Sequence, residues 1–195
     1  MAGKPATGVT TDAAIVVATD PDRPDYVSRG GHKLAGALTA FAQEGLSVTG
    51  RRCLDAGAST GGFTDVLLRE GAREVVAVDV GYGQLAWSLR TDDRVTVLDR
   101  QNVRELTPEL VGGQVDLVVG DLSFISLELV LDALVAVTAP TGDLALMVKP
   151  QFEVGKDRVG KGGVVRDPDL RIEAVTTIAE AGARRGWGAR SVTVS

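Results

Sequence analysis

The chain has 195 residues, the size of a single α/β domain. Apolar residues make up 44% of it and aromatic residues only 4%, so the core must be built largely from Val, Leu and Ala, as in buried parallel strands. The formal net charge of −5 excludes nucleic-acid binding by an overall basic surface, because phosphate contacts usually come from such a surface.

The most apolar stretches, Val115–Val119 and Leu144–Val148, are far shorter than the roughly 18 residues that a membrane helix needs. The sequence does not open with a basic stretch followed by an apolar one, as a secretion signal would. The single cysteine, Cys53, cannot form a disulfide within the chain and heads an apolar strand, which indicates a buried side chain. These features predict a soluble, cytoplasmic protein.

Residues Met1–Arg23 are polar apart from the apolar run Ala13–Val17, and they indicate a linker or the remnant of a preceding domain. Between Ser28 and Gly45 the spacing predicts a helix, whose apolar face carries Leu34, Leu38 and Phe41.

From residue 52 onward, strands and helices alternate, which predicts a doubly wound parallel sheet with ligands at the carboxyl ends of its strands. The aperiodic segment Gln151–Asp167 predicts a long mobile loop. The expected strands are Arg52–Asp55, Glu74–Val80, Val95–Asp99, Val115–Asp121, Asp143–Lys149 and one near Ala189–Val194. The expected helices are Gly62–Arg69, Gln84–Arg90, Leu127–Val137 and Pro168–Arg185.

The segment Asp55–Phe63 follows the first strand and opens a helix, and its glycines permit close backbone approach to a ligand. A dinucleotide fingerprint would have glycine where Ala58 stands, which disfavours a pyrophosphate. Asp55 would also repel a pyrophosphate but would accept hydrogen bonds from an ammonium group, as S-adenosylmethionine carries. A tight strand-to-helix turn without a ligand is the alternative.

Acidic and amide side chains at the next two strand ends suit an adenosine. Asp79 ends the second strand at the spacing of a carboxylate that binds ribose hydroxyls, although it could instead cap a helix. Asp99 or Asn102 is placed for the adenine edge, and the turn that ends at Gln84 could pack beside the ribose. The sequence therefore predicts an S-adenosylmethionine site.

The fourth and fifth strands end in Asp121 and Lys149, which we expect to meet beside the cofactor's sulfonium. Enzymes that methylate exocyclic amines usually carry two prolines where this chain has Leu122 and Ser123, so an alcohol acceptor is favoured. A lysine can remove or steer a hydroxyl proton, because desolvation and a neighbouring cation lower a lysine's pKa. A plain salt bridge is the alternative interpretation.

The chain resembles the TlyA family of ribosomal RNA 2′-O-methyltransferases, also named hemolysins, which share a catalytic core with the FtsJ-like (RrmJ) enzymes. The resemblance implies a Rossmann-like S-adenosylmethionine-dependent methyltransferase sheet and transfer of a methyl group to a ribose 2′-hydroxyl of ribosomal RNA, with cytidine as the nucleoside. No metal ion is expected. The stretches that carry the resemblance are Tyr26–Leu34, Asp55–Phe63, Asp79–Trp87, Asp121–Ser126 and Val148–Gly155.

The family uses a Lys-Asp-Lys-Glu tetrad, of which Lys33, Asp121 and Lys149 match here as expected catalytic residues. The resemblance places the glutamate and the final strand beyond Ser195, and Glu153 is a poor substitute because it belongs to the family's own loop pattern. The expected cofactor-binding residues are Asp55, Gly57, Ser59, Thr60, Gly61, Gly62, Phe63, Asp79, Val80, Gln84, Asp99, Asn102 and Asp121.

The resemblance also implies a domain organisation. Residues 1–25 would be the linker or remnant of a small RNA-binding domain of the ribosomal-protein S-four type, and residues 26–195 a methyltransferase domain lacking its final strand. The lost domain would supply much of the affinity for ribosomal RNA, and an open sheet edge would permit a homodimer. The basic clusters are Arg23, Arg29, His32 and Lys33, and Lys149, Lys156, Arg158, Lys161, Arg166 and Arg171.

Two other functions stay open at this point. The family's second name suggests a membrane-active hemolysin, which the sequence does not support with an apolar span or a basic amphipathic helix. A fragment that binds S-adenosylmethionine without turnover is the other, since a catalytic acid and an RNA-binding domain are expected to be missing.

Overall fold

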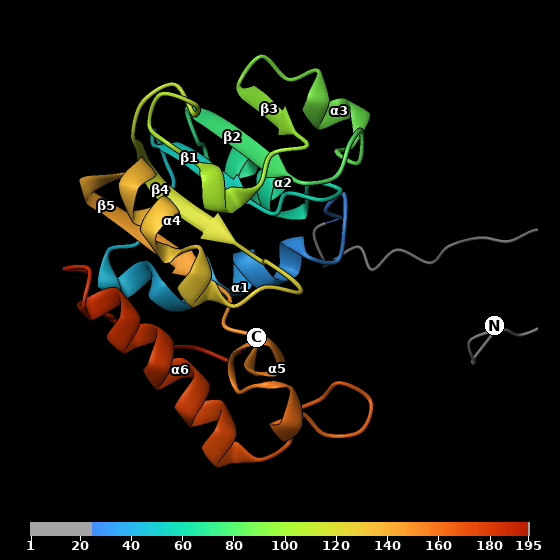
Figure 1. Ribbon diagram of the computed structural model, residues 1–195. Coiled ribbons are helices and arrows are strands. Elements are labelled where there is room, and N and C mark those ends of the chain that lie inside the picture. The colour runs from blue at the N-terminus through green and yellow to red at the C-terminus, as the bar shows by residue number, and fades with distance from the viewer. Residues whose placement is uncertain (1–24, 195) are drawn as a thin grey trace, which may run out of the picture.

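The computed structural model describes residues 25–194, so the predicted linker and its apolar run Ala13–Val17 lie outside the described residues. Five parallel strands form one sheet in the order β3-β2-β1-β4-β5 (Figure 1). The strands are β1 (Arg52–Ala56), β2 (Glu74–Asp79), β3 (Val95–Asp99), β4 (Val115–Gly120) and β5 (Thr138–Leu146). The predicted α/β class and parallel sheet are confirmed.

Helices cover both faces of this sheet, which explains why its strands are apolar almost throughout. The helices are α1 (Gly31–Phe41), α2 (Gly62–Arg69), α3 (Trp87–Arg90), α4 (Leu131–Val137), α5 (Pro150–Glu153) and α6 (Pro168–Ala183). Short 3-10 turns are η1 (Ala42–Glu44), η2 (Val103–Glu105), η3 (Leu127–Leu129) and η4 (Lys156–Arg158).

Successive strand residues point to opposite faces and divide the core in two. Cys53 and Val75 belong to the cluster under α1, α2 and α3, whereas Leu54 and Val76 belong to the cluster under α4 and α6. All four side chains are fully buried. Because β1 pairs with β2 on one side and with β4 on the other, the chain reverses its direction of winding at β1. In sheets of this kind that reversal opens a crevice at the carboxyl ends of the strands.

The strand expected near Ala189–Val194 is wrong, since residues 187–194 form no strand. Val192 and Val194 are 65% and 97% exposed, so this segment buries no apolar face against the sheet. Polar contacts hold the segment instead: Arg190 pairs with Asp143 at 3.3 Å, and Ser191 Oγ donates a 2.7 Å hydrogen bond to Glu44 Oε1. The alternating valines predicted a strand, but they do not form one here because they pack against no neighbouring strand.

Gln151–Asp167 is largely without regular structure, as expected for a long loop, but it contains two short helical segments and packs against α6, while its mobility stays a prediction. It contains most of α5 and all of η4, and it builds a small core of its own in which Val154 and Val165 are buried against Ala174 of α6. Arg158 adds two hydrogen bonds to the carboxylate of Glu173. Because these contacts join the segment to α6, the periodicity of the segment's own sequence does not predict them.

Three other predicted elements have different bounds in the structure. The fifth strand ends at Leu146, three residues before Lys149, and Pro150 then begins α5. The helix expected over Leu127–Val137 is divided into η3 and α4, and the one expected over Gln84–Arg90 is only α3. Within residues 25–194, the chain has no helix with the length and apolar character to cross a membrane.

Candidate active site

The loop between β1 and α2 lies at the point where the order of the strands reverses, since β2 and β3 lie on one side of β1 and β4 and β5 on the other. Gly57 and Gly61 adopt φ angles of 84° and 100°, the left-handed region that favours glycine. A Cβ at Gly61 would overlap Leu89, and one at Gly62 would overlap the hydroxyl of Ser28. The missing side chain of Gly61 thus lets α3 approach the start of α2 closely, and that of Gly62 does the same for the segment before α1.

Asp79, at the end of β2, holds this loop through its carboxylate. Its Oδ2 accepts a 2.8 Å hydrogen bond from Ser59 N, and its Oδ1 accepts one of 2.7 Å from Gly81 N. A carboxylate oxygen has a second lone pair, so both oxygens retain the capacity to accept from a ribose hydroxyl.

Asp55 lies beneath the same loop and is only 1% exposed. Its Oδ2 accepts a 2.7 Å hydrogen bond from Thr64 Oγ1. Burial raises the pKa of Asp55 to about 7, and the charges of Asp79 and Asp121 add to this rise, while the hydrogen bonds from Thr64 oppose it. Asp55 is therefore a carboxyl group that can be neutral or ionised near physiological pH.

The residues predicted for the adenine edge form local contacts of their own. Asp99 pairs with Arg90 and accepts a 3.3 Å hydrogen bond from Gly83 N, and the bond from Arg90 holds the pKa of Asp99 below its ordinary value. Asn102 caps η2 by accepting from Arg104 N at 3.0 Å. Val80 and Gln84 are exposed. None of these four residues lines the cavity beside the glycine loop.

A cavity of about 610 Å³ opens beside the glycine loop. Six predicted cofactor-binding residues line it: Gly57, Ser59, Thr60, Gly62, Phe63 and Asp121. Seven do not: Asp55, Gly61, Asp79, Val80, Gln84, Asp99 and Asn102. The lining also includes all three expected catalytic residues, Ala58, and four residues that sequence reasoning did not single out for the site, namely Ser28, Arg29, Gly30 and Ser123. All four lie in the stretches that carry the family resemblance, close to Lys33 or Asp121, and Arg29 also belongs to a basic cluster.

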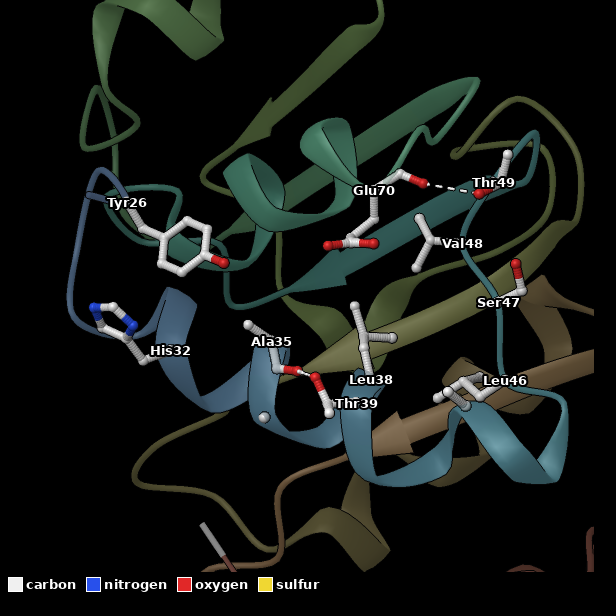
Figure 2. A pocket seen from close by; sticks show the side chains of 12 residues that line it. Tyr26, His32, Ala35, Leu38, Thr39, Leu46, Ser47, Val48, Thr49 and Glu70 are labelled. Carbon is white, nitrogen blue, oxygen red and sulfur yellow. Dashed lines mark hydrogen bonds between the residues drawn. The ribbon is translucent and has the colours of Figure 1, made fainter. Parts of the chain in front are cut away.

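Figure 2 shows a second cavity of about 620 Å³, which α1 also borders. Its wall includes Tyr26 and His32, whose rings lie 5.0 Å apart edge to face, and the apolar side chains of Leu38 and Val48. His32 and Lys33 are consecutive, yet His32 lines this cavity and Lys33 lines the one beside the glycine loop. The lysines and the aspartate thus gather on one side of α1.

Lys33, Asp121 and Lys149 come together at the edge of the cavity beside the glycine loop. Lys33 Nζ donates a 2.8 Å hydrogen bond to Asp121 Oδ2, and Lys149 Nζ lies 2.6 Å from Asp121 Oδ1. The contact with Oδ1 is an ion pair without good hydrogen-bond geometry, whereas Lys149 Nζ donates hydrogen bonds to Ser123 Oγ at 2.7 Å and to the carbonyl oxygen of Asp121 at 3.4 Å. The three charged residues come from α1, the end of β4 and the segment after β5.

Two opposing effects act on the carboxyl group of Asp121. Burial raises its pKa, but the close contacts with the ammonium groups of Lys149 and Lys33 outweigh burial, and the pKa lies below its ordinary value. Asp121 is therefore ionised at neutral pH and holds two ammonium groups next to the cavity. Such a group of charges can orient a hydroxyl and stabilise negative charge that develops on its oxygen.

An exposed aromatic side chain lies close to these charges along the chain. Phe124 is 92% exposed and adopts a φ angle of 65°, which is unusual for a large side chain. Its ring centroid lies 5.5 Å from that of Phe152 on α5. Two rings therefore lie side by side on the loops that carry Asp121 and Lys149.

Comparison with known proteins is consistent with this geometry. A family model described as FtsJ-like methyltransferase matches residues 26–195. The 16S/23S rRNA (cytidine-2′-O)-methyltransferase TlyA of Mycobacterium tuberculosis is 60% identical over 192 residues, 98% of this chain and 70% of that protein. YqxC of Bacillus subtilis, named as an rRNA methyltransferase, is 42% identical over 98% of this chain and 67% of its own length.

A solved structure shows the same fold at substantial sequence identity. It is a protein from Streptococcus thermophilus named as a hemolysin, with a TM-score of 0.77 and 42% identity over 84% of this chain. The match covers 60% of that protein. The chain thus spans between 60% and 70% of the length of these three proteins.

Proposed function

Because the chain belongs to the FtsJ-like methyltransferase family, we propose that it transfers a methyl group from S-adenosylmethionine to a ribose 2′-hydroxyl of ribosomal RNA. The TlyA relative of Mycobacterium tuberculosis, whose name specifies this reaction on cytidine, supports cytidine as the nucleoside. The observation that carries the proposal is the ion-paired group of Lys33, Asp121 and Lys149 beside the glycine loop. The protein would then act where ribosomal RNA is found.

The residues around the glycine loop suit S-adenosylmethionine, which supplies an electrophilic methyl group on a positively charged sulfur. Gly57 brings backbone close to Leu122, since a Cβ there would lie 3.0 Å from Leu122 Cδ2. Neither Asp55 nor Asp79 lines the cavity, but both contact the glycine loop or the start of α2, and we assign Asp55 to the ammonium group and Asp79 to the ribose hydroxyls. A phosphate ligand would be repelled by the charge of Asp79, and by Asp55 where that carboxyl group is ionised.

Lys149 is the residue we assign to the hydroxyl proton. It is 17% exposed, held by Asp121 and Ser123, and therefore fixed in direction. Lys33 shares the carboxylate of Asp121, so the negative charge is divided between two ammonium groups rather than held by Lys149 alone. In this mechanism the 2′-oxygen would form a bond to the methyl carbon as the bond from that carbon to sulfur breaks, and the hydroxyl proton would leave to a water molecule that Lys149 orients. The ammonium groups of Lys149 and Lys33 would stabilise the oxygen as its negative charge grows.

Phe124 and Phe152 provide a surface for the base of the target nucleotide. Aromatic side chains stack on bases of single-stranded RNA, typically for about 1–3 kcal/mol per base. Because the net charge of the chain is −5, phosphate contacts must be local, and Arg29 beside Lys33 in the cavity is one candidate. Pairing of a second copy along β5, an edge strand of the described sheet, stays a prediction.

The test is methyl transfer with the full chain. Ribosomal subunits and purified ribosomal RNA are incubated with S-adenosylmethionine that carries a labelled methyl group, and the RNA is then digested to nucleosides. We expect label in 2′-O-methylcytidine. Label only in methylated bases would reject the ribose assignment, and binding of the cofactor without any transfer would leave only the binding function.

A further inference from the structure

A second set of contacts joins the two loops that carry the charged residues. Ser126 Oγ donates a 2.6 Å hydrogen bond to Glu153 Oε2, and Leu127 N donates one of 3.0 Å to Glu153 Oε1. Ser126 and Leu127 follow β4, whereas Glu153 belongs to α5 after β5. Both oxygens of one carboxylate therefore bridge the loops, 26 and 27 residues apart along the chain.

Glu153 is joined to Lys149 through a single helical turn. Lys149 is the N-cap of α5, and its carbonyl oxygen accepts a 2.9 Å hydrogen bond from Phe152 N. Pro150 at the first helical position restricts the backbone at this point. The hydrogen bonds that hold Glu153 in place therefore also restrain the backbone of Lys149, from which its side chain extends.

In the loop after β4, the carboxylate of Glu153 holds one end of a segment with strained backbone. Phe124, in left-handed backbone, lies between Asp121 and Ser126. Such a conformation persists only where the surrounding structure holds it. Asp121 is held by the two lysines at one end of the segment, and Glu153 holds Ser126 and Leu127 at the other. Without the second anchor, we expect the loop to relax and to displace Ser123, which accepts the hydrogen bond of Lys149.

We propose that Glu153 is a positioning residue for methyl transfer, which fixes Lys149 and the Phe124 loop relative to each other by binding Ser126 and Leu127. This inference rests on the proposed function. Glu153 does not line the cavity beside the glycine loop, and both of its oxygens are engaged by these two donors. It therefore acts through Lys149 and the Phe124 loop and is not a replacement for the family's fourth catalytic residue.

Three variants of the full chain test the inference. In Glu153→Gln, the amide oxygen can still accept from Leu127 N and the amide nitrogen can donate to Ser126 Oγ, so most of the bridge survives. Glu153→Ala removes both bonds. Ser126→Ala removes one of them together with the hydrogen bond by which Ser126 Oγ caps η3 at Glu128 N, which costs about 1 kcal/mol of stability. Glu105→Ala is the matched control, because Glu105 is an exposed glutamate on the short turn η2.

The measurements are kcat and KM for RNA, the Kd for S-adenosylmethionine, and amide hydrogen exchange at Leu127. We expect Glu153→Ala to lower kcat by about tenfold to a hundredfold, because small misplacements of reacting groups have effects of this order. Ser126→Ala should lower it less, Glu153→Gln should stay within about threefold of wild type, and the cofactor Kd should not change. Exchange at Leu127 should become faster in Glu153→Ala alone.

Each contrary result is distinct. Equal loss of kcat in Glu153→Gln and Glu153→Ala, with Ser126→Ala normal, would make Glu153 a group that needs its charge, and the positioning role would be rejected. Normal kcat in Glu153→Ala would reject it too. If the wild-type chain transfers no methyl group, the proposed function fails, and unchanged exchange at Leu127 in Glu153→Ala would still overturn the bridge itself.

Discussion

Lys33 on α1 and Asp121 at the end of β4, 88 residues apart in the sequence, form an ion pair with a separation of 2.8 Å. A helix that precedes the whole sheet thus contributes a charge to the edge where β4 and β5 end. Lys149, which follows β5 and so lies C-terminal to Asp121 in the sequence, contacts the same carboxylate at 2.6 Å. The chemistry of the site depends on this shared carboxylate.

Removing Lys149 should impair methyl transfer more than removing Lys33. We expect Lys149→Ala to lower kcat at least about a hundredfold, the usual loss when a proton-transferring group is removed. Lys33→Ala should lower it less, because Lys33 is 40% exposed and Lys149 17%. Lys161→Ala, an exposed lysine outside the cavity, is the control in the same labelled-methyl assay. Undiminished 2′-O-methylation by Lys149→Ala would remove that residue from the mechanism.

The buried carboxyl of Asp55 should make the stability of the fold depend on pH. Its pKa rises from an ordinary 3.8 to about 7 in the folded protein. Between these values the unfolded chain has released a proton that the folded protein still holds, so unfolding releases a proton and a rising pH favours unfolding. The contribution is fully present below about pH 4 and is lost as the pH rises through 7.

The variant Asp55→Asn isolates this effect, because its amide oxygen can still accept the hydrogen bond of Thr64. Urea unfolding at pH 5 and pH 8 should show wild type losing more stability than the variant, by at most about 3 kcal/mol. The difference between the two proteins is the quantity to compare, since other groups titrate equally in both. An identical pH dependence would show that Asp55 is ionised throughout.

Two substitutions at Phe124 should distinguish the effect of backbone strain from that of aromatic stacking. Phe124→Gly and Phe124→Ala both remove the ring, but only glycine accepts a φ angle of 65° without strain. We expect the glycine variant to be more stable than the alanine variant by about 1 kcal/mol in urea unfolding. Both should lose roughly tenfold or more in kcat/KM for RNA, as expected for a lost base stack. Normal kcat/KM in both variants would exclude Phe124 as a base-binding surface.

Asp79 should be needed for cofactor binding. In Asp79→Asn, one side-chain oxygen becomes an NH₂ group that would face a backbone N–H of either Ser59 or Gly81, two donors without an acceptor. We expect the Kd for S-adenosylmethionine to rise by about tenfold or more in titration calorimetry. The free loop can relieve the mismatch by leaving its binding conformation, so binding must restore that conformation at a cost of about 1–3 kcal/mol. Asp157→Asn, at an exposed position on η4, is the control. Equal affinity in both variants would contradict a role for Asp79.

Much of the fold was predictable because it follows from local patterns. Apolar runs such as Val75–Val78 alternate with helical segments, and this alternation admits few arrangements other than a parallel sheet covered on both faces. The glycines of the loop after β1 are also local signals, because backbone with positive φ favours glycine wherever it occurs. The approach of Asp121 and Lys149 follows from the same logic, since neighbouring parallel strands end at one edge.

Other features required the folded chain, because they are contacts between distant segments. Sequence patterns alone did not place Lys33 against Asp121, and only the family resemblance suggested it. The small core formed by Val154 and Val165 has no period, and the bridge from Glu153 to Ser126 depends on two loops meeting after separate strands. Sequence alone thus determined the five strands of the sheet and the edge at which their ends gather. The tertiary structure decided which side chains meet there, because distances between side chains depend on how the helices and loops pack around the sheet.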